Sequence, residues 1–214
     1  MTADTITTAN ALADRLQRLA GDSPRFMVAI AGPPGAGKST LAAALVQTLQ
    51  SRGESAVVVP MDGFHLDDTI LNARNHRARK GACFTFDCAG LEVLLQRIRQ
   101  REHEVAVPVF DRGLELSRAA AAIVSAEVRF VIVEGNYLLL SETPWNRLYQ
   151  LFDDRVFLDV PVEELRHRLL ARMQSFGFSQ EHAERWLEEN DLLNIQQVLS
   201  ASADPDLRIS PADS

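Results

Sequence analysis

Residues 26–40 read Phe26-Met27-Val28-Ala29-Ile30-Ala31-Gly32-Pro33-Pro34-Gly35-Ala36-Gly37-Lys38-Ser39-Thr40 and carry the strongest structural signal in the chain. The stretch begins with a continuous apolar run, which is typical of a short strand buried on both faces. The residues after this run match the pattern G-x-x-x-x-G-K-[ST], in which backbone N–H groups and the start of a helix bind phosphate. The stretch therefore predicts a buried strand, a phosphate-binding loop and a helix.

The chemistry of the loop explains its residue types. Gly35 and Gly37 allow backbone conformations that turn successive N–H groups inward. Lys38 adds a positive charge at the β- and γ-phosphates of ATP, and the Ser39 hydroxyl is a Mg²⁺ ligand. A glycine-rich turn that binds nothing is the weaker alternative, because a strand precedes the loop and a helix follows it. The residues expected to bind the nucleotide are Gly32, Pro33, Pro34, Gly35, Ala36, Gly37, Lys38, Ser39 and Thr40.

The segments on either side of the loop alternate between helical and strand patterns. Apolar residues at helical spacing predict helices over 6–19, 38–52, 91–98, 162–176, 179–190 and 192–199. Short apolar runs predict strands over 56–59, 105–109, 130–133, 156–158 and 207–209. Strand, helix, strand is the unit of a parallel sheet. We therefore expect an α/β chain with a three-layer P-loop NTPase fold, in which helices flank a parallel sheet and add a helical lid.

Composition narrows the classes of protein. The 214 residues carry a formal net charge of −7, which argues against a general nucleic-acid binder. Two cysteines, Cys83 and Cys88, are too few for a disulfide scaffold and are expected to be reduced thiols. No apolar run has membrane-span length, and the start of the chain lacks signal-peptide features. We expect a cytoplasmic protein without membrane insertion, and the sequence leaves its oligomeric state open.

Two acidic residues follow predicted strands. Glu134 ends the run Val131-Ile132-Val133, where it is expected to lie near the Mg²⁺ of the loop, directly or through a metal-bound water. Asp62 follows the strand at 56–59 and is expected to accept the proton of an attacking hydroxyl or to orient that hydroxyl. The alternatives are an ordinary carboxylate at a strand end for Glu134 and a turn-forming residue before Gly63 for Asp62.

These motifs resemble a known family. The phosphate loop, the string Met61-Asp62-Gly63-Phe64-His65, Val133-Glu134-Gly135 and the arginine-bearing helix after Asp159-Val160-Pro161 resemble the uridine kinase, pantothenate kinase and phosphoribulokinase group. Longer strings, such as Phe110-Asp111-Arg112 and the segment from Asn136 to Leu140, are similar to bacterial fructose transport-system kinases. The resemblance covers about residues 24–210. It implies a small-molecule kinase with Asp62 as base or positioning residue, Glu134 near Mg²⁺ and a mobile lid.

One departure bears on the substrate. Uridine kinases carry Asn-Phe-Asp-His-Pro where this chain reads Lys80-Gly81-Ala82-Cys83-Phe84, so the acid that contacts ribose in those enzymes is missing here. The Lys-Gly string followed by an aromatic residue and Asp looks more like pantothenate kinase.

The remaining candidates form a lid and a substrate wall. A single domain over 1–214 is expected to contain a substrate loop at about 61–88 and a lid at about 166–195, with Gly177 as a hinge. Arg168 and Arg172 share a helix face and are expected to neutralise phosphoryl charge, although the register among these and Arg166 stays open. Asn194 is a candidate for adenine contact. The candidates for the acceptor pocket are His65, Arg79, Phe110, Asp111, Arg112 and Glu115, where Asp111 and Arg112 could instead pair with each other.

The sequence thus predicts an ATP- and Mg²⁺-dependent kinase that phosphorylates a hydroxyl of a small polar metabolite, with a sugar such as fructose as one candidate. Nucleosides and pantothenate are alternative acceptors. A nucleotide-dependent switch or regulatory ATPase is an alternative of another class, and an inactive nucleotide-binding partner of a transporter is a third. No Thr-Lys-x-Asp-like string supports specificity for GTP.

Overall fold

The centre of the molecule is a parallel sheet, formed within residues 2–210 by β1 (Phe26–Ala31), β2 (Ala56–Pro60), β5 (Phe130–Gly135), β6 (Asp154–Leu158) and β7 (Leu207–Ile209). The strand order is β2-β5-β1-β6-β7, and each neighbouring pair runs parallel. The structure is a computed structural model that describes residues 2–210, so the ends of the expected 1–214 domain lie outside the described residues. Strands β1 and β5 are buried along their whole length, as their apolar runs predict.

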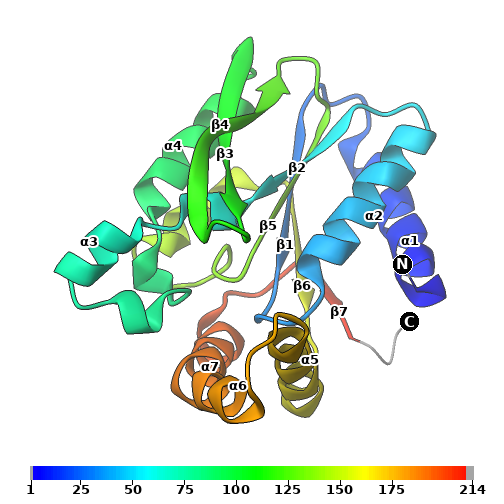
Figure 1. The fold of residues 1–214 in the computed structure, drawn as a ribbon. Coiled ribbons are helices and arrows are strands. Elements are labelled where there is room, and N and C mark those ends of the chain that lie inside the picture. The colour runs from blue at the N-terminus through cyan, green and yellow to red at the C-terminus, as the bar shows by residue number, and fades with distance from the viewer. Residues whose placement is uncertain (1, 211–214) are drawn as a thin grey trace.

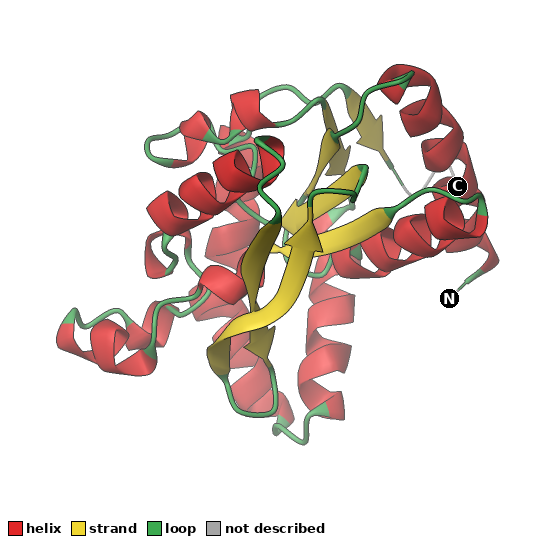
Figure 2. Ribbon diagram, turned by 90° about the horizontal axis from the view of Figure 1, so that it is seen from above, coloured by secondary structure: helices red, strands yellow, loops and turns green. Residues whose placement is uncertain are grey.

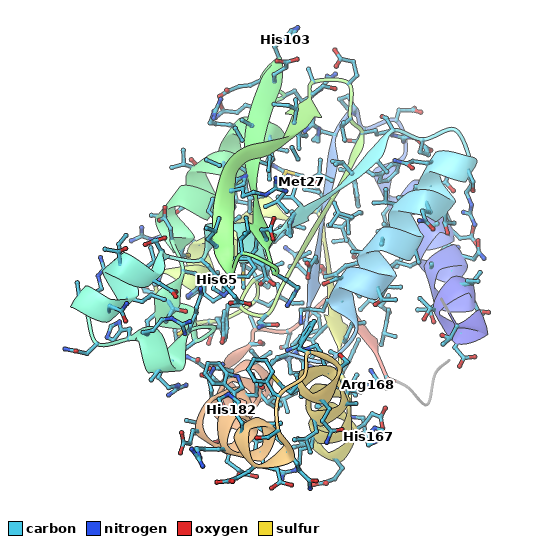
Figure 3. All side chains as sticks on the ribbon, in the orientation of Figure 1. Met27, His65, His103, His167, Arg168 and His182 are labelled. Carbon is cyan, nitrogen blue, oxygen red and sulfur yellow. The ribbon has the colours of Figure 1, made fainter. Side chains whose placement is uncertain are left out.

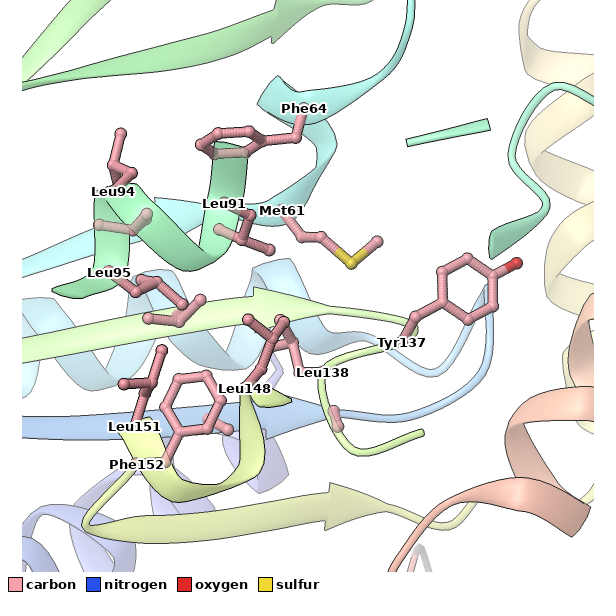
Figure 4. Close-up of a cluster of buried hydrophobic side chains, with 14 of the residues drawn as sticks. Met61, Phe64, Leu91, Leu94, Leu95, Tyr137, Leu138, Leu148, Leu151 and Phe152 are labelled. Atoms are coloured by element: carbon pink, nitrogen blue, oxygen red, sulfur yellow. The ribbon is translucent and has the colours of Figure 1, made fainter. Parts of the chain in front are cut away.

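Helices cover both faces of the sheet (Figures 1 and 2). On one face α1 (Ala3–Ala20) and α2 (Lys38–Ser51) bury leucines such as Leu12, Leu16 and Leu45 against it. On the other face α4 (Cys88–Arg99) packs with the segment that contains the 3₁₀ turns Trp145–Arg147 and Tyr149–Leu151. Figure 4 shows part of this second core, in which leucines surround Met61 and Phe152 and the Tyr137 hydroxyl points away. The predicted three-layer α/β fold is therefore confirmed.

A β-hairpin lies outside the main sheet, and the sequence predicted only one of its two strands. Strand β3 (Glu104–Asp111) pairs antiparallel with β4 (Leu116–Ser125), and the sequence indicated the first of these alone. The alanine run at 119–122 has no strand pattern, because both faces of β4 are largely exposed there. The hairpin packs tightly on the 3₁₀ helix η1 (Met61–Phe64): a Cβ on Gly63 would lie 2.2 Å from the carbonyl oxygen of Pro108. It therefore fixes the turn that carries Asp62.

The segment 61–88, which lacks periodicity, folds into short pieces. After η1 come α3 (Asp68–Ala73) and two 3₁₀ turns, η2 (Arg77–Arg79) and η3 (Cys83–Thr85). Helices of three to six residues make fewer than two turns, so no apolar stripe repeats along them in the sequence. The segment lies beside the carboxyl ends of the strands, close to the hairpin (Figure 1).

The C-terminal helices lie below the carboxyl ends of the strands (Figure 1). Helix α5 (Val162–Ser175) is followed by α6 (Gln180–Trp186), a π-helical turn (Leu187–Asp191) and α7 (Leu192–Ala201). Ser179 caps the start of α6, where its hydroxyl accepts a hydrogen bond from the backbone N–H of His182. Among the described residues, no helix combines the length and the apolar character that crossing a membrane requires.

Candidate active site

Sheet register brings the phosphate loop, Glu134 and Asp62 to one edge. Glu134 in β5 lies opposite Ile30 of β1 on one side and opposite Pro60 of β2 on the other. The loop follows Ile30 by two residues, and Asp62 follows Pro60 by two residues. Carboxyl ends of adjacent parallel strands are where ligands bind in such sheets. Glu134 therefore stands between the phosphate loop and Asp62.

The loop has the backbone geometry of an anion cradle. Gly35 and Gly37 have φ values of 82° and 93°, which side-chain-bearing residues rarely adopt. Helix α2 begins at Lys38, so its free N–H groups face the loop. The buried Lys38 ammonium donates to the carbonyl oxygen of Pro33 at 2.9 Å. Burial lowers the pKa of Lys38 to about 8, against the opposing effects of Glu134 and Asp62.

Ser39 and Glu134 form an oxygen pair beside the loop. The Ser39 hydroxyl donates to Glu134 Oε1 at 3.1 Å. Burial raises the pKa of Glu134, the negative charge of Asp62 raises it further, and Lys38 opposes both. A hydroxyl and a buried carboxylate are the hard oxygen donors that Mg²⁺ prefers, together with waters and phosphate oxygens. Within residues 2–210 no group of three or more His, Cys, Asp or Glu side chains could hold a metal ion. The Ser39–Glu134 pair supplies two oxygens to an ion that takes its other ligands from water and phosphate.

Asp62 faces the cavity from η1, and a side chain of the protein binds only one of its two carboxylate oxygens. Its Oδ2 accepts from Arg112 of the hairpin at 3.2 Å, and both side chains are partly exposed. Its backbone carbonyl lies 2.8 Å from Nδ1 of His65. The second carboxylate oxygen has no protein donor among the described residues, which leaves it available to a ligand hydroxyl.

An aromatic wall adjoins Asp62. The His65 ring lies 4.0 Å from the ring centre of Phe86 and 4.7 Å from that of Phe110. Burial lowers the pKa of His65, so the ring is neutral near pH 7 and is suited to polar contact without charge. Figure 3 places His65 on the side facing the C-terminal helices, while His103 lies at the far end of the molecule.

The C-terminal helices supply arginines to the opposite wall. Arg168 and Arg172 both line the cavity, and an Arg168 N–H lies 3.5 Å from the carbonyl oxygen of Gly35. Arg166 instead pairs with Glu188 at 2.8 Å, away from the cavity. Arg168 and Arg172 rather than Arg166 therefore lie at the cavity wall, and Arg168 also pairs with Glu164 at 2.8 Å. Gly177, which follows α5, has a φ of 83°.

Two predicted pocket residues do not reach the cavity. The Arg79 guanidinium donates to the side-chain oxygens of Asn190 at 3.0 Å and Asn194 at 3.2 Å. Asp111 accepts from the backbone N–H groups of its own turn and pairs with Arg118 at 3.3 Å, so it does not pair with Arg112. Both side chains have protein partners that the sequence could not reveal.

Asn194 and Glu115 both line the cavity, and both also contact other residues of the protein. Asn194 is buried, lines the cavity and accepts from Arg79, which occupies one of the two acceptor positions of its side-chain oxygen. Glu115 stands at the exposed mouth, where its backbone carbonyl accepts from the buried Lys80 ammonium at 2.8 Å.

The phosphate loop, Asp62, His65 and Glu134, together with Arg168 and Arg172, line one cavity of about 710 Å³. Several of its wall residues were not identified as site residues from the sequence, because no local motif marks a side chain that reaches the site by packing. They are Lys80, Phe86, Asn136, Phe176, Phe178, Trp186, Asn190 and Asp191. For Asn136 a signal was available, since it begins the string 136–140 that carries part of the resemblance.

Comparisons with known proteins agree with this geometry. A family model described as "Methylmalonyl Co-A mutase-associated GTPase MeaB" matches residues 2–65, which hold the phosphate loop and Asp62 but less than half of the chain. A Schizosaccharomyces pombe protein named "Putative uridine kinase" is 34% identical over 206 residues, covering 92% of this chain and 87% of its own. The "Uncharacterized protein YggC" of Escherichia coli is 35% identical over 185 residues, covering 86% and 76%.

One solved structure matches almost the whole chain. The "putative fructose transport system kinase" from Silicibacter sp. TM1040 is 37% identical, with a TM-score of 0.89. The match covers 94% of this chain and 98% of that chain. The similarity therefore includes the hairpin and the C-terminal helices as well as the nucleotide-binding half.

Proposed function

The chain belongs to the P-loop ATP-dependent kinases of the uridine kinase-like group, and on this basis we propose that it transfers the γ-phosphate of ATP to a hydroxyl group of a small polar metabolite. The observation that carries the proposal is the single cavity lined by the phosphate loop, Glu134 and Asp62. A phosphate site alone would also suit a switch. A carboxylate that faces the cavity with one oxygen free supports a hydroxyl acceptor.

On the nucleotide side, residues 32–40 would bind the phosphates through backbone N–H groups and the Lys38 ammonium. The oxygens of Ser39 and Glu134, 3.1 Å apart, would hold Mg²⁺, with Glu134 acting directly or through a water. An ion held there would supply positive charge that offsets the negative charge of the phosphates. Lys38 leaves Pro33 for the phosphates, because a charged acceptor is the stronger partner.

On the acceptor side, Asp62 orients the attacking hydroxyl or takes its proton. Arg112 keeps one carboxylate oxygen occupied and the carboxylate turned toward the hairpin, so the free oxygen serves the acceptor. Positioning and neutralisation of charge contribute at least as much as proton removal in phosphoryl transfer.

Residues 166–195 would act as a lid that closes about Gly177 over both ligands. Arg168 and Arg172 would then neutralise charge on the transferring phosphoryl group. Arg168 already contacts the phosphate loop, and Arg172 lines the same cavity. The segment 61–88 would form the substrate loop of the same domain.

The acceptor pocket of Asp62, His65, Phe110, Arg112 and Glu115 combines polar groups with one aromatic wall. This chemistry suits a sugar such as fructose, which has polar edges and apolar C–H faces. A nucleoside fits the same features, and pantothenate remains an alternative acceptor.

An ADP-release screen over sugars, nucleosides and pantothenate tests the proposal. The expected result is ADP release from Mg·ATP that one compound accelerates in proportion to its phosphorylated product. A switch or regulatory ATPase would instead hydrolyse ATP at a rate that no small acceptor changes, and that outcome would refute the proposed function.

A further inference from the structure

The π-helical turn Leu187–Asp191 places two buried polar side chains next to each other between α6 and α7. Asn190 is 2% exposed and Asp191 is 8% exposed. Such a turn inserts an extra residue into the helical repeat, and π-helical turns frequently occur at functional sites. Both side chains thereby line the cavity.

Asn190 holds the turn in place. Its amide nitrogen donates to the backbone carbonyl of Lys80 at 2.9 Å, and its oxygen accepts from Arg79 at 3.0 Å. These contacts tie the turn to the substrate loop. Asp191, the next residue, is therefore held in a fixed position at the cavity wall.

Asp191 has no such partners. Within residues 2–210 its carboxylate makes no side-chain hydrogen bond and no ion pair, although it is more than nine-tenths buried. The nearest positive influence is Arg172, which lines the same cavity and acts on Asp191 without a direct contact. Burial raises the pKa of Asp191 to about 6, so the carboxylate is largely ionised near neutral pH.

A buried carboxylate without donors costs free energy, which the chain would avoid with an apolar residue. Perturbed carboxylates in clefts are candidates for functional sites for this reason. Because Asp191 lines the cavity, a molecule bound there can supply donors to its carboxylate in place of water. Hydroxyl groups fit this carboxylate, whereas a phosphate or carboxylate on the ligand would be repelled by it.

We propose that Asp191 binds a hydroxyl of the acceptor other than the one that is phosphorylated, so that the site takes polyhydroxylated acceptors such as sugars or the ribose of a nucleoside. This inference rests on the proposed function. Its second support is placement: Arg172 interacts electrostatically with both Asp191 and Asp62, and so does Tyr137. Both carboxylates line the same cavity, Asp62 for the reacting hydroxyl and Asp191 for another hydroxyl of the acceptor.

The test compares Asp191→Asn with Glu189→Gln, an exposed residue of the same turn. D-fructose, D-ribose, uridine and pantothenate are assayed with the wild type, and the best acceptor among them is used for steady-state kinetics. We expect Asp191→Asn to raise the KM for that acceptor by about 10- to 100-fold, as for loss of a hydrogen bond to a charged group. The KM for ATP and the Tm should stay near wild type, and Glu189→Gln should change none of these values.

Monodeoxy analogues of that acceptor identify the hydroxyl. The analogue that lacks the hydroxyl bound by Asp191 should bind the wild type weakly and lose no further affinity in Asp191→Asn. An unchanged acceptor KM in Asp191→Asn overturns the inference. A fall in kcat at constant acceptor KM also overturns it, because Asp191 would then act through Arg172.

Two further outcomes are decisive. Loss of the folding transition in Asp191→Asn would assign the carboxylate to folding and contradict the inference. If no compound is phosphorylated by the wild type, the proposed function fails, and the inference fails with it. A normal wild-type kinase with an unaffected variant refutes the inference alone.

Discussion

The phosphate end and the acceptor end of the cavity are built in different ways. The phosphate end comes from one contiguous stretch, residues 32–40, whose backbone conformation forms the site. The acceptor end collects Asp62, His65, Phe110 and Asp191 from separate segments that must first pack together. A contiguous loop ties function to local conformation, whereas an assembled wall ties it to tertiary structure. Substitutions at the phosphate end should therefore lower turnover of ATP with every acceptor. Substitutions at the acceptor end should instead affect the acceptor and leave ATP binding unchanged.

The largest expected effect is at Lys38. We expect Lys38→Ala to lower ATP turnover by about 10³-fold or more, because the only side-chain charge of the loop is removed from the transferring phosphate. ADP release with and without acceptor measures this. Arg18→Ala, an exposed cation at the end of α1, is the control and should retain wild-type turnover. Wild-type turnover in Lys38→Ala would contradict the assignment of the loop.

A substitution at Asp62 tests whether a change at the acceptor end reduces phosphoryl transfer without reducing ATP binding. We expect Asp62→Asn to reduce phosphoryl transfer by about 10²- to 10⁴-fold, since loss of the carboxylate removes general base help and hydroxyl positioning. ATP affinity, measured by calorimetry with a non-hydrolysable analogue, should be retained. Asp111→Asn is the matched control, because Asp111 caps its own turn outside the cavity. A full transfer rate in Asp62→Asn would remove Asp62 from the reaction.

The lid arginines give a smaller effect at the boundary between the two ends. We expect Arg172→Ala to lower kcat by about 10²-fold, less than an essential arginine would, because Arg168 remains. Arg166→Ala removes only an exposed ion pair with Glu188 and should leave kcat near wild type. Steady-state kinetics on both variants measures the difference. Equal losses would mean that the lid acts through its overall charge rather than through the side chains that line the cavity.

The same contrast explains what the sequence could predict. The strand, loop and helix of residues 26–52 were predicted because apolar pattern and glycine spacing are local properties. The family resemblance was confirmed by the comparisons, and so was the fold class. Strand β4 was missed because its alanines are exposed on both faces of the strand. The sequence there shows no alternation of apolar and polar residues.

The assembled wall was less predictable for a physical reason. Arg79 and Asn194 were chosen from the right segments, but they hydrogen-bond to each other, and sequence spacing carries no information on such a contact. A π-helical turn has nearly the same local pattern as an α-helix, so the burial of Asp191 could not be anticipated. Asp62 was predictable because it directly follows a strand, where topology alone places it at the site.

The smallest expected effect concerns the two tyrosines. Tyr137 is fully buried, and its hydroxyl donates to the backbone carbonyl of Gly81 at 2.6 Å, which anchors the substrate loop. The hydroxyl of Tyr149 donates to the backbone carbonyl of Asp204 at 3.0 Å near the surface. We expect Tyr137→Phe to lower the free energy of unfolding by about 1–2 kcal/mol, because the Gly81 carbonyl loses its donor. For a chain of this length each kcal/mol corresponds to a fall in Tm of about 2–4 °C.

Tyr149→Phe should change stability by less than about 0.5 kcal/mol, since water can replace the lost partner at an exposed carbonyl. Urea unfolding of both variants measures the difference in stability, and steady-state kinetics reports on the site. Because Tyr137 anchors only the acceptor end, its variant should raise the KM for the acceptor and leave the KM for ATP unchanged. Parallel changes in both KM values would show that the two ends of the cavity are mechanically coupled, and the distinction between a local site and an assembled one would then not hold.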